Sequence, residues 1–436
     1  MNVPTHLPIV LFEDDRVVDL GPIVDTRPAF ELRCGILNLR ERIEAIATTA
    51  NVYGSVRAYL TEITRGLVPL LDDGDAEVLA VNAQLTGTVD DLARAIASLG
   101  SGSEIRVDGR LWMARTTASE LPARASARDD DGSSAPTGLG FFARPWEVVA
   151  ANEQHLVADA GWLAGRGAPE RRIFGVDFED HSPRLQWLAA AAWVDGAELA
   201  DIFPGATFVE SERIHVARGA RVRPGAVIDA EEGPVVLGPG CVVHPLSVVV
   251  GPAYVGPGSV VNPGAKLREG TSVGAFCKVG GEIEESVIHD LSNKQHDGFL
   301  GHALVGNWVN LGADTNGSDL KNNYGPVRVD LGDGPIDTGL SFVGQLLADH
   351  VKTGIDTMLT TGGVVGVAGN VFGGGFAPRF FPAFGWGGAD GIREYRLDDA
   401  LRTARTVMAR RDVRWTAAHE ELLRTVFART AAQRAG

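Results

Sequence analysis

A strict repeat of six residues dominates the sequence between Leu237 and Val279. Every sixth position in this stretch is a branched aliphatic residue, without a break: Leu237, Val243, Val249, Val255, Val261, Leu267, Val273 and Val279. A helix places apolar residues three or four positions apart, and a single half-buried strand places them two apart. A period of six fits neither, and it is typical of short strands joined by tight turns in a parallel β-helix.

Small side chains keep the same phase, four positions after the first seven aliphatic residues: Cys241, Ser247, Ala253, Ser259, Ala265, Thr271 and Cys277. We expect the aliphatic residue to point into the coil and the small one to let the corner close. Glycine, frequent between them, takes backbone angles that other residues resist. An irregular loop rich in Gly and Pro would explain the composition of this stretch but not its phase.

The composition narrows the class of protein. The chain has 436 residues, of which 44% are apolar, and a net charge of −16, which fits about two or three globular domains and argues against a nucleic-acid partner. The three cysteines form no CxxC pair, and their odd number favours a reducing compartment. There is no signal-peptide pattern and no apolar run near the ~20 residues that span a bilayer, so we expect a cytoplasmic protein without membrane attachment.

Strands and helices alternate in the first half of the chain, which predicts an α/β domain over residues 1–204. We expect strands at 7–12 and 78–81, helices at 37–47, 89–99, 146–157 and 184–199, and a polar surface loop at 119–138. The β-helix is expected over residues 205–388. Gly and Pro nearly vanish from residue 390 onward, and the helical periodicity there predicts C-terminal helices over 389–436.

The six-residue phase extends beyond the central stretch, with interruptions. It begins at Val216, Val222 and Ile228, is lost after Val279, returns at Phe299, Val305 and Leu311, breaks again over 315–340, and resumes at Leu359, Val365 and Val371. Such repeats can extrude residues at a corner, and function is often found there.

Polar residues crowd the two interruptions, Ser292–His302 and Asp314–Gly325. Histidine, with an unperturbed pKa near 6.5, is a natural general base at neutral pH. No Ser-His-Asp order or HExxH pattern is present. His296 and His302 are six residues apart, but no third metal ligand stands out, so we expect no metal site.

The run His296-Asp-Gly-Phe-Leu-Gly-His-Ala-Leu-Val-Gly-Asn-Trp-Val-Asn310-Leu-Gly-Ala resembles the acetyltransferase half of the bifunctional UDP-N-acetylglucosamine pyrophosphorylase/glucosamine-1-phosphate N-acetyltransferases. The runs SNKQHDGFLGH, NLGADTNGSDLKNNYG and GIDTMLTTGGVVGVAGNVFGGGF are similar to a divergent branch of that family, as are the N-terminal DTRP and GILNLRERIE. The resemblance implies a left-handed β-helix, a homotrimer with sites between subunits, and acetyl-CoA as co-substrate. It implies that His296 is the general base and that Asn310, Asn323 and Tyr324 line the sugar and acyl site.

The sequence departs from the family pattern at the positions that bind the sugar phosphate in the family. The family's phosphate-binding Arg and Lys match Asn262 and Gly280, and the family's Tyr three residues after the base matches Phe299. The missing charge would then come from Lys278, Lys294 or Lys321. Farther along, His350 and Lys352 are candidates for contacts with the coenzyme's pantetheine or phosphates, or belong to a surface loop.

The N-terminal region departs further. Enzymes of this nucleotidyltransferase type open with a strand and a Gly-rich loop whose amides cradle phosphates. Here the first strand is followed by Glu13-Asp14-Asp15, and Gln84 stands where an Asp for Mg²⁺ is expected. We therefore expect a degenerate domain that uses Mg²⁺ only if it is active. Arg27 and Arg33 either hold a nucleotide phosphate or are structural.

Three functions remain open from the sequence. The first is an acetyl-CoA-dependent N-acyltransferase acting on an amino sugar, either as its phosphate or linked to a nucleotide. The second is a bifunctional or purely nucleotidyltransferase enzyme, and the third is a non-catalytic trimeric scaffold.

Overall fold

The computed structural model describes residues 7–47, 52–70, 74–128 and 134–434. The chain forms two compact units. Unit 1 comprises Met1–Leu20, Arg27–Arg33 and Leu37–Arg144, and unit 2 comprises Gly21–Thr26, Cys34–Ile36 and Pro145–Gly436. None of the helices in the described part of the chain has the length and apolar character needed to cross a bilayer.

Unit 1 is built on a five-stranded mixed sheet. Its order is β2 (Val52–Ser55), β1 (Ile9–Phe12), β3 (Glu77–Asn82), β6 (Arg110–Thr117) and β5 (Glu104–Val107). Strand β1 is parallel to both of its neighbours, whereas β6 is antiparallel to β3 and β5. All four residues of β1 are buried, as expected for a central parallel strand covered on both faces. The strands predicted at 7–12 and 78–81 are confirmed.

Two helices of unit 1 begin with capping boxes, in which a side chain at the helix start and one three residues later each bond the other's backbone amide. In α1 (Leu39–Ile46) the pair is Asn38 and Glu41, and in α3 (Val89–Ser98) it is Thr88 and Asp91. These helices confirm two of the predicted ones. The remaining α-helices and strands of the described part of unit 1 are α2 (Thr61–Arg65), α4 (Leu121–Ser126) and the antiparallel pair β4 (Leu85–Thr86) and β7 (Gly140–Phe141). Helix α4 forms where a loop was predicted over 119–138, and residues 129–133 of that stretch lie outside the described residues.

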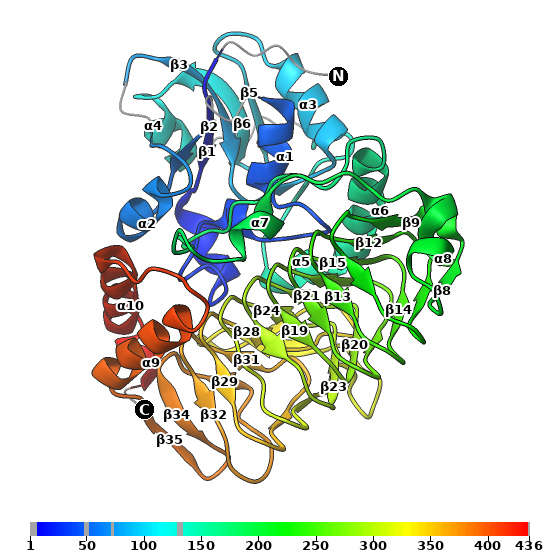
Figure 1. Cartoon of the computed structure of the whole chain (residues 1–436). Helices are drawn as coiled ribbons and strands as arrows, with labels where there is room; N and C mark the ends of the chain where they lie inside the picture. Colours follow the sequence, from blue (N-terminus) through cyan, green and yellow to red (C-terminus); the bar gives the residue numbers. More distant parts are fainter. Residues whose placement is uncertain (1–6, 48–51, 71–73, 129–133, 435–436) are drawn as a thin grey trace. The chain divides into compact units, whose positions relative to one another are not determined.

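Unit 2 is a parallel β-helix whose strands form three faces, which confirms the predicted coil. In Figure 1 its strands follow one another as rungs, from green through yellow to orange. Face A contains β10 (Arg221–Val222), β13 (Val242–Val243), β16 (Val260–Val261), β19 (Lys278–Val279), β22 (Asn293–Lys294), β29 (Lys352–Thr353), β32 (Asn370–Val371) and β34 (Gly385–Gly388), with β35 (Gly391–Glu394) antiparallel at its end.

Faces B and C complete the coil. Face B contains β8 (Thr207–Val209), β11 (Val227–Asp229), β14 (Val248–Val250), β17 (Lys266–Leu267), β20 (Glu282–Glu284), β23 (Phe299–Gly301), β25 (Asn316–Gly317) and β30 (Met358–Leu359). Face C contains β9 (Ile214–Val216), β12 (Val235–Leu237), β15 (Ala253–Val255), β18 (Thr271–Val273), β21 (Val287–Ile288), β24 (Leu304–Val305), β28 (Leu346–Leu347), β31 (Val364–Val365) and β33 (Phe380–Phe381).

The coil continues through the place where the six-residue phase is lost. On face C, Val255 pairs with Val273, 18 residues later, but Val273 pairs with Ile288, only 15 residues later. Shortened corners therefore break the period without breaking the coil. The prediction that the phase returns at Phe299 is wrong by one residue: Leu300 pairs with the core residue Ile283 and is buried, whereas Phe299 is half-exposed.

Outside the coil, several elements differ from expectation. The helix predicted over 146–157 is present as α5 (Pro145–Ala150) and α6 (Asn152–Leu163). The helix predicted over 184–199 is wrong: the short α7 (Leu185–Leu188), a 3-10 turn at Gly196–Glu198 and the start of α8 (Leu199–Ile202) form instead. Between them, Ala191 and Trp193 pair their backbones with Ala168 and Ala217.

The last two segments complete unit 2. The second interruption of the repeat is an insertion with its own antiparallel hairpin, β26 (Arg328–Asp330) and β27 (Pro335–Asp337). The chain ends with helices α9 (Leu397–Ala409) and α10 (Ala417–Arg429), shown in red beside the last turns of the coil in Figure 1.

Candidate functional site

His296 occupies the corner between β22 on face A and β23 on face B, and its side chain is exposed. The imidazole makes no hydrogen bond to any described residue, whereas its backbone carbonyl accepts a bond of 2.7 Å from Lys294 Nζ. The imidazole of His296 is therefore exposed and makes no hydrogen bond within the described residues, while Lys294 fixes the backbone that carries it.

Lys294 takes a position that the coil normally gives to an apolar residue. It pairs with Val279, a core residue, and is only 3% exposed. Its Nζ donates to the carbonyl oxygens of His296 at 2.7 Å and Asp297 at 3.0 Å. Burial lowers the pKa of Lys294 to about 8. A buried ammonium requires such partners, so the lysine and the His296 corner constrain one another.

A column of outward-facing polar residues runs along face A beside this corner. Lys278 pairs with Asn293, Asn293 with Asn310, and Asn310 with Lys352. Adjacent strands lie about 4.8 Å apart, so these residues are near neighbours although they span 75 positions in the sequence. The Nδ2 of Asn293 donates to Asn310 Oδ1 at 3.2 Å. Three residues predicted from separate stretches, Lys278, Asn310 and Lys352, are thereby brought together.

This column forms one wall of a hollow of about 410 Å³, which we call the basic hollow. Gln295, the residue before His296, also lines it. Among the described residues no Asp or Glu lines the hollow. Its cationic side chains come from the coil, from the segment before α7 and from the end of α9: Arg184, Lys278, Lys352, Arg410 and Arg411. The three arginines were missed by the sequence analysis, because no motif marks a helix end that folds back on the coil.

Two cations of the basic hollow are held by neutral groups. Arg411 donates to Asn293 Oδ1 at 2.9 Å and to the carbonyl of Phe276 at 3.1 Å. Its pKa is lowered, mainly by burial and further by the positive charges of Arg184 and Arg410. Lys352 Nζ donates to the carbonyl of His350 at 3.1 Å, and burial lowers the pKa of Lys352 to about 8.

Other predicted site residues lie elsewhere in unit 2. Phe299 is on face B, where its amide donates to Asn316 Oδ1 at 2.9 Å. Asn323 and Tyr324 lie in the insertion after β25, and Tyr324 is 75% exposed. The ring of His350 stacks on Trp308, a residue that lines the hollow, with centroids 6.1 Å apart. Lys321 Nζ donates to the carbonyl of Pro326. In this chain, none of these side chains joins the wall of the basic hollow.

A third group gathers at the corner between faces B and C. Glu284, His302 and Asp319 follow one another on successive rungs, and their ligand atoms all lie within 4.8 Å of one another. The sequence predicted no metal site because Glu284 and Asp319 lie far from His302 in the chain. Arg268 pairs with Glu284 at 2.8 Å, and His302 Nδ1 lies 2.8 Å from Asp319 Oδ2. These two pairs account for the cluster without an ion.

In unit 1, the residues matched to a nucleotidyl site form a closed polar cluster. Arg110 donates to both carboxylate oxygens of Asp14, at 2.8 and 2.6 Å, and to Gln84 Oε1 at 2.6 Å. Asn82 also donates to Asp14, at 3.0 Å. All four residues are buried. Burial by itself raises the pKa of Asp14, but the bonds and charge of Arg110 outweigh it, so the pKa lies below its usual range.

The acidic triplet after β1 is neutralised residue by residue. Glu13 pairs with Arg57 at 3.0 Å, Asp14 with Arg110, and Asp15 with Arg128. Arg27 and Arg33, predicted as phosphate ligands or structural residues, are 2% and 5% exposed. Arg33 lies 3.8 Å from Glu41.

Comparisons with known proteins match the N-terminal part of the chain to a family and longer stretches to individual proteins. Residues 9–167 match the family model of the sugar nucleotidyl transferases. The chain is 31% identical over 261 residues to the bifunctional protein GlmU of Nostoc sp., an alignment that covers 52% of this chain and 56% of that protein. It is 29% identical over 98 residues to a bifunctional sugar-1-phosphate nucleotidylyltransferase/acetyltransferase of Sulfurisphaera tokodaii, covering 22% of this chain and 24% of that protein.

These matches confirm the resemblance to the bifunctional family, but the chain spans only about a quarter to just over half the length of these relatives. Among solved structures, the N-acyltransferase AntD from Bacillus cereus, in complex with dTDP and 3-hydroxybutyryl-CoA, is 11% identical. The alignment covers 50% of this chain and 97% of AntD, with a TM-score of 0.17. A score this low supports no inference about this protein.

Proposed function

We propose that this protein is an N-acyltransferase that moves the acyl group of an acyl-CoA, with acetyl-CoA the first candidate, to the amine of an amino sugar. The acceptor is a sugar phosphate or a nucleotide-linked sugar. One observation carries the proposal: Lys278, Asn310 and Lys352, selected from separate stretches of sequence, line one hollow that reaches Gln295, next to the exposed ring of His296. The bifunctional relatives support it.

In the proposed reaction, the amine nitrogen attacks the thioester carbonyl carbon, and His296 takes the proton that the nitrogen loses. The tetrahedral intermediate carries an oxyanion, which a backbone amide or the Asn310 side chain stabilises by hydrogen bonding. Collapse of the intermediate breaks the C–S bond, and the thiolate of CoA takes up a proton. Every step is proton transfer and acyl substitution at carbon. Lys294 holds the carbonyls of the corner and so sets where the base stands.

The remaining predicted residues have assigned places in this proposal. Phe299, Asn323 and Tyr324 contact the acceptor sugar, and His350 and Lys352 contact the coenzyme. Because the first three lie away from the basic hollow in one chain, the proposal needs a trimer in which a neighbouring subunit supplies them. Lys278 and Lys294 are the candidates for the charge that the family places on the sugar phosphate.

The direct test is an acyl-transfer assay. The purified chain is incubated with acetyl-CoA and a panel of amino-sugar phosphates and nucleotide-linked amino sugars, and free thiol and acylated product are measured. Turnover with at least one acceptor, lost on His296→Ala, supports the proposal. No release of CoA with any amine would favour the scaffold alternative instead.

A second candidate function is nucleotidyl transfer, because residues 9–167 match sugar nucleotidyl transferases. The Arg110–Asp14–Gln84 cluster opposes it, since the guanidinium occupies the oxygens that a Mg²⁺ ion would need. We expect little or no Mg²⁺-dependent formation of a nucleotide sugar from UTP or dTTP and sugar 1-phosphates. Robust formation of such a product would establish a bifunctional enzyme.

A further inference from the structure

The basic hollow is lined by positive charges, although the chain as a whole is strongly negative. The chain carries a net charge of −16, yet five cationic side chains line this one volume, and of the described residues no carboxylate does. The cations converge from three distant places, namely the coil, the segment before α7 and the end of α9. Such an arrangement concentrates positive potential in a concave site.

These charges are poorly compensated. Only Arg184 has a carboxylate partner, Asp412, among the described residues. Arg411 and Lys352 bond to carbonyl or amide oxygens, and the side chains of Lys278 and Arg410 bond to none of the described residues. Like charges held close together destabilise one another, and a bound anion would reverse that repulsion.

A helix end explains only part of this pattern. Cations at the C-terminal end of a helix interact favourably with its dipole, which accounts for Arg410 and Arg411 after α9. It does not account for Lys278 and Lys352, which stand on the coil and face the same hollow. The common feature of all these groups is the volume that they surround.

We propose that the basic hollow binds the diphosphate group of a nucleotide ligand, and that the end of helix α9 is therefore part of the substrate site. A guanidinium donates two parallel bonds to phosphate oxygens, and a lysine adds a point charge. A volume of about 410 Å³ lies in the range of small-molecule sites. Two ligands share this chemistry, namely the ADP end of CoA and the diphosphate of a nucleotide-linked sugar. The choice between them rests on the proposed function, whereas diphosphate binding does not.

Calorimetric titration of the full chain tests this inference, with CoA, UDP and inorganic pyrophosphate as probes and inorganic phosphate for comparison. We expect the three diphosphates to bind more tightly than phosphate. Lys278→Glu and Arg410→Glu should each weaken that binding about tenfold or more, because each replaces an attraction by a repulsion.

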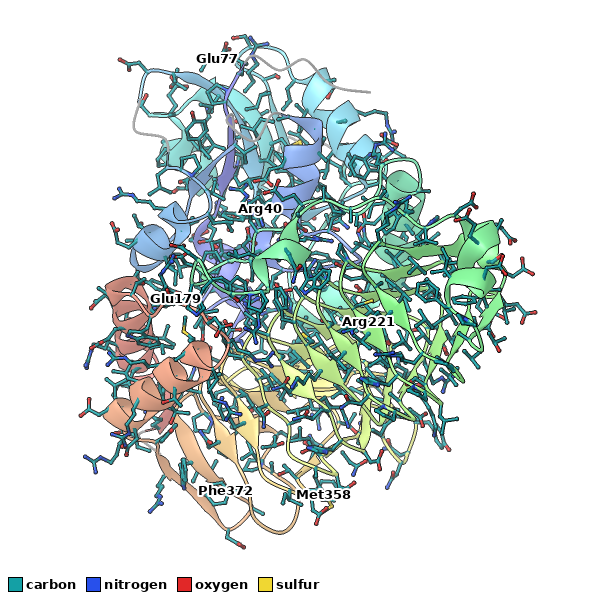
Figure 2. All side chains as sticks on the ribbon, in the orientation of Figure 1. Arg40, Glu77, Glu179, Arg221, Met358 and Phe372 are labelled. Carbon is teal, nitrogen blue, oxygen red and sulfur yellow. The ribbon has the colours of Figure 1, made fainter. Side chains whose placement is uncertain are left out.

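Two matched control variants make the same change of net charge, Arg to Glu, at positions outside the hollow. Arg221→Glu lies in the same column of face A, three rungs before Lys278, and is labelled in Figure 2. Arg402→Glu lies on α9 and is 71% exposed in its pair with Asp399. Both should leave diphosphate affinity within about twofold of the unmodified chain, since neither lines the hollow.

The probes separate the sources. Tighter binding of CoA than of UDP assigns the hollow to the acyl donor, and the reverse assigns it to a nucleotide-linked acceptor. Equal losses in the hollow variants and the controls, or no diphosphate binding at all, would overturn the inference. If Lys278→Glu catalyses acyl transfer with unchanged KM values for acyl-CoA and the acceptor, the hollow does not bind the diphosphate, and the proposed function stands. If Lys278→Glu loses diphosphate binding but the unmodified chain acylates no amine, diphosphate binding in the hollow is supported and the proposed function is wrong.

Discussion

Two polar regions of this chain use arginine in opposite ways. In unit 1, Arg110 is buried and its donors are matched to Asp14 and Gln84. In unit 2, the basic hollow gathers five cations, of which only Arg184 has a carboxylate partner among the described residues. A charge that is already paired stabilises the fold and leaves nothing for a ligand. A charge held without its counter-ion costs stability and is available for binding.

The same difference explains why we propose acyl transfer by unit 2 and expect little or no nucleotidyl transfer by unit 1. Three acidic residues in a row after β1 would by themselves repel a triphosphate. The structure pairs each acid with an arginine, so repulsion is the wrong reason. The site is closed because its acceptors are consumed internally, whereas the corner at His296 leaves the imidazole without a partner in the described part of the chain.

The largest expected effect is at that corner. His296→Ala should lower kcat for acyl transfer by about 10²–10⁴, the usual contribution of a general base, with little change in the affinity for acetyl-CoA. Steady-state kinetics would measure it. His244→Ala is the matched control, since it too is a histidine that follows a face A strand, β13. A variant of His296 with unchanged kcat would place the base elsewhere.

The next effect concerns the closed cluster. Arg110→Ala leaves the buried carboxylate of Asp14 without its cation, which should destabilise the fold by about 3–5 kcal/mol. Denaturant unfolding monitored by circular dichroism gives this value. The double variant Arg110→Ala/Asp14→Asn should recover part of the loss, because the unpaired charge is removed. A single variant as stable as the unmodified chain would show that the cluster is not sealed.

The two regions should also respond differently to pH. The pKa of Asp14 is lowered from 3.8, so its pairing stabilises the fold above about pH 4, and the stabilisation disappears as the pH falls through the lowered value. Lys294 and Lys352 have folded-state pKa values of about 8, below the ordinary 10.5. The unfolded chain therefore binds more protons between these values, and stability should rise from pH 8 to 10.5, by about 1–3 kcal/mol per lysine.

Lys294→Met isolates the alkaline part of that profile, because methionine fills the inward position of the coil without a charge. Unfolding midpoints measured from pH 7 to 10.5 should rise less steeply in this variant than in the unmodified chain. An identical slope would mean that Lys294 keeps its ordinary proton affinity in the fold.

The smallest expected effect is the counterpart of the Arg110 experiment. Lys278→Ala removes a cation without a carboxylate partner, so the free energy of unfolding should change by less than about 0.5 kcal/mol. The same denaturant titration compares the two variants directly. A loss as large as that of Arg110→Ala would erase the distinction between a paired and an available charge.

Sequence reasoning succeeded where local pattern and structure coincide. The eight aliphatic residues from Leu237 to Val279 all lie in the core of the coil, because each turn of a β-helix buries one residue on each of its three faces. It failed where a turn is shortened, since one missing corner residue shifts the phase and leads to Phe299 instead of Leu300. It also failed at 184–199, where backbone pairing to other segments replaces helical bonds.

By itself, the sequence determined the coil, its inward residues, the corner that carries His296 and the α/β class of the first unit. These follow from spacing and residue type, which act over a few positions. The tertiary structure alone decided that Lys278, Asn310 and Lys352 share a wall. It also decided that two arginines at the end of α9 and one before α7 reach that wall, and that Arg110 fills the cluster around Asp14. Each of these contacts joins residues that are tens to hundreds of positions apart in the sequence. No local pattern encodes such contacts, because they depend on how many residues each corner of the coil omits or inserts.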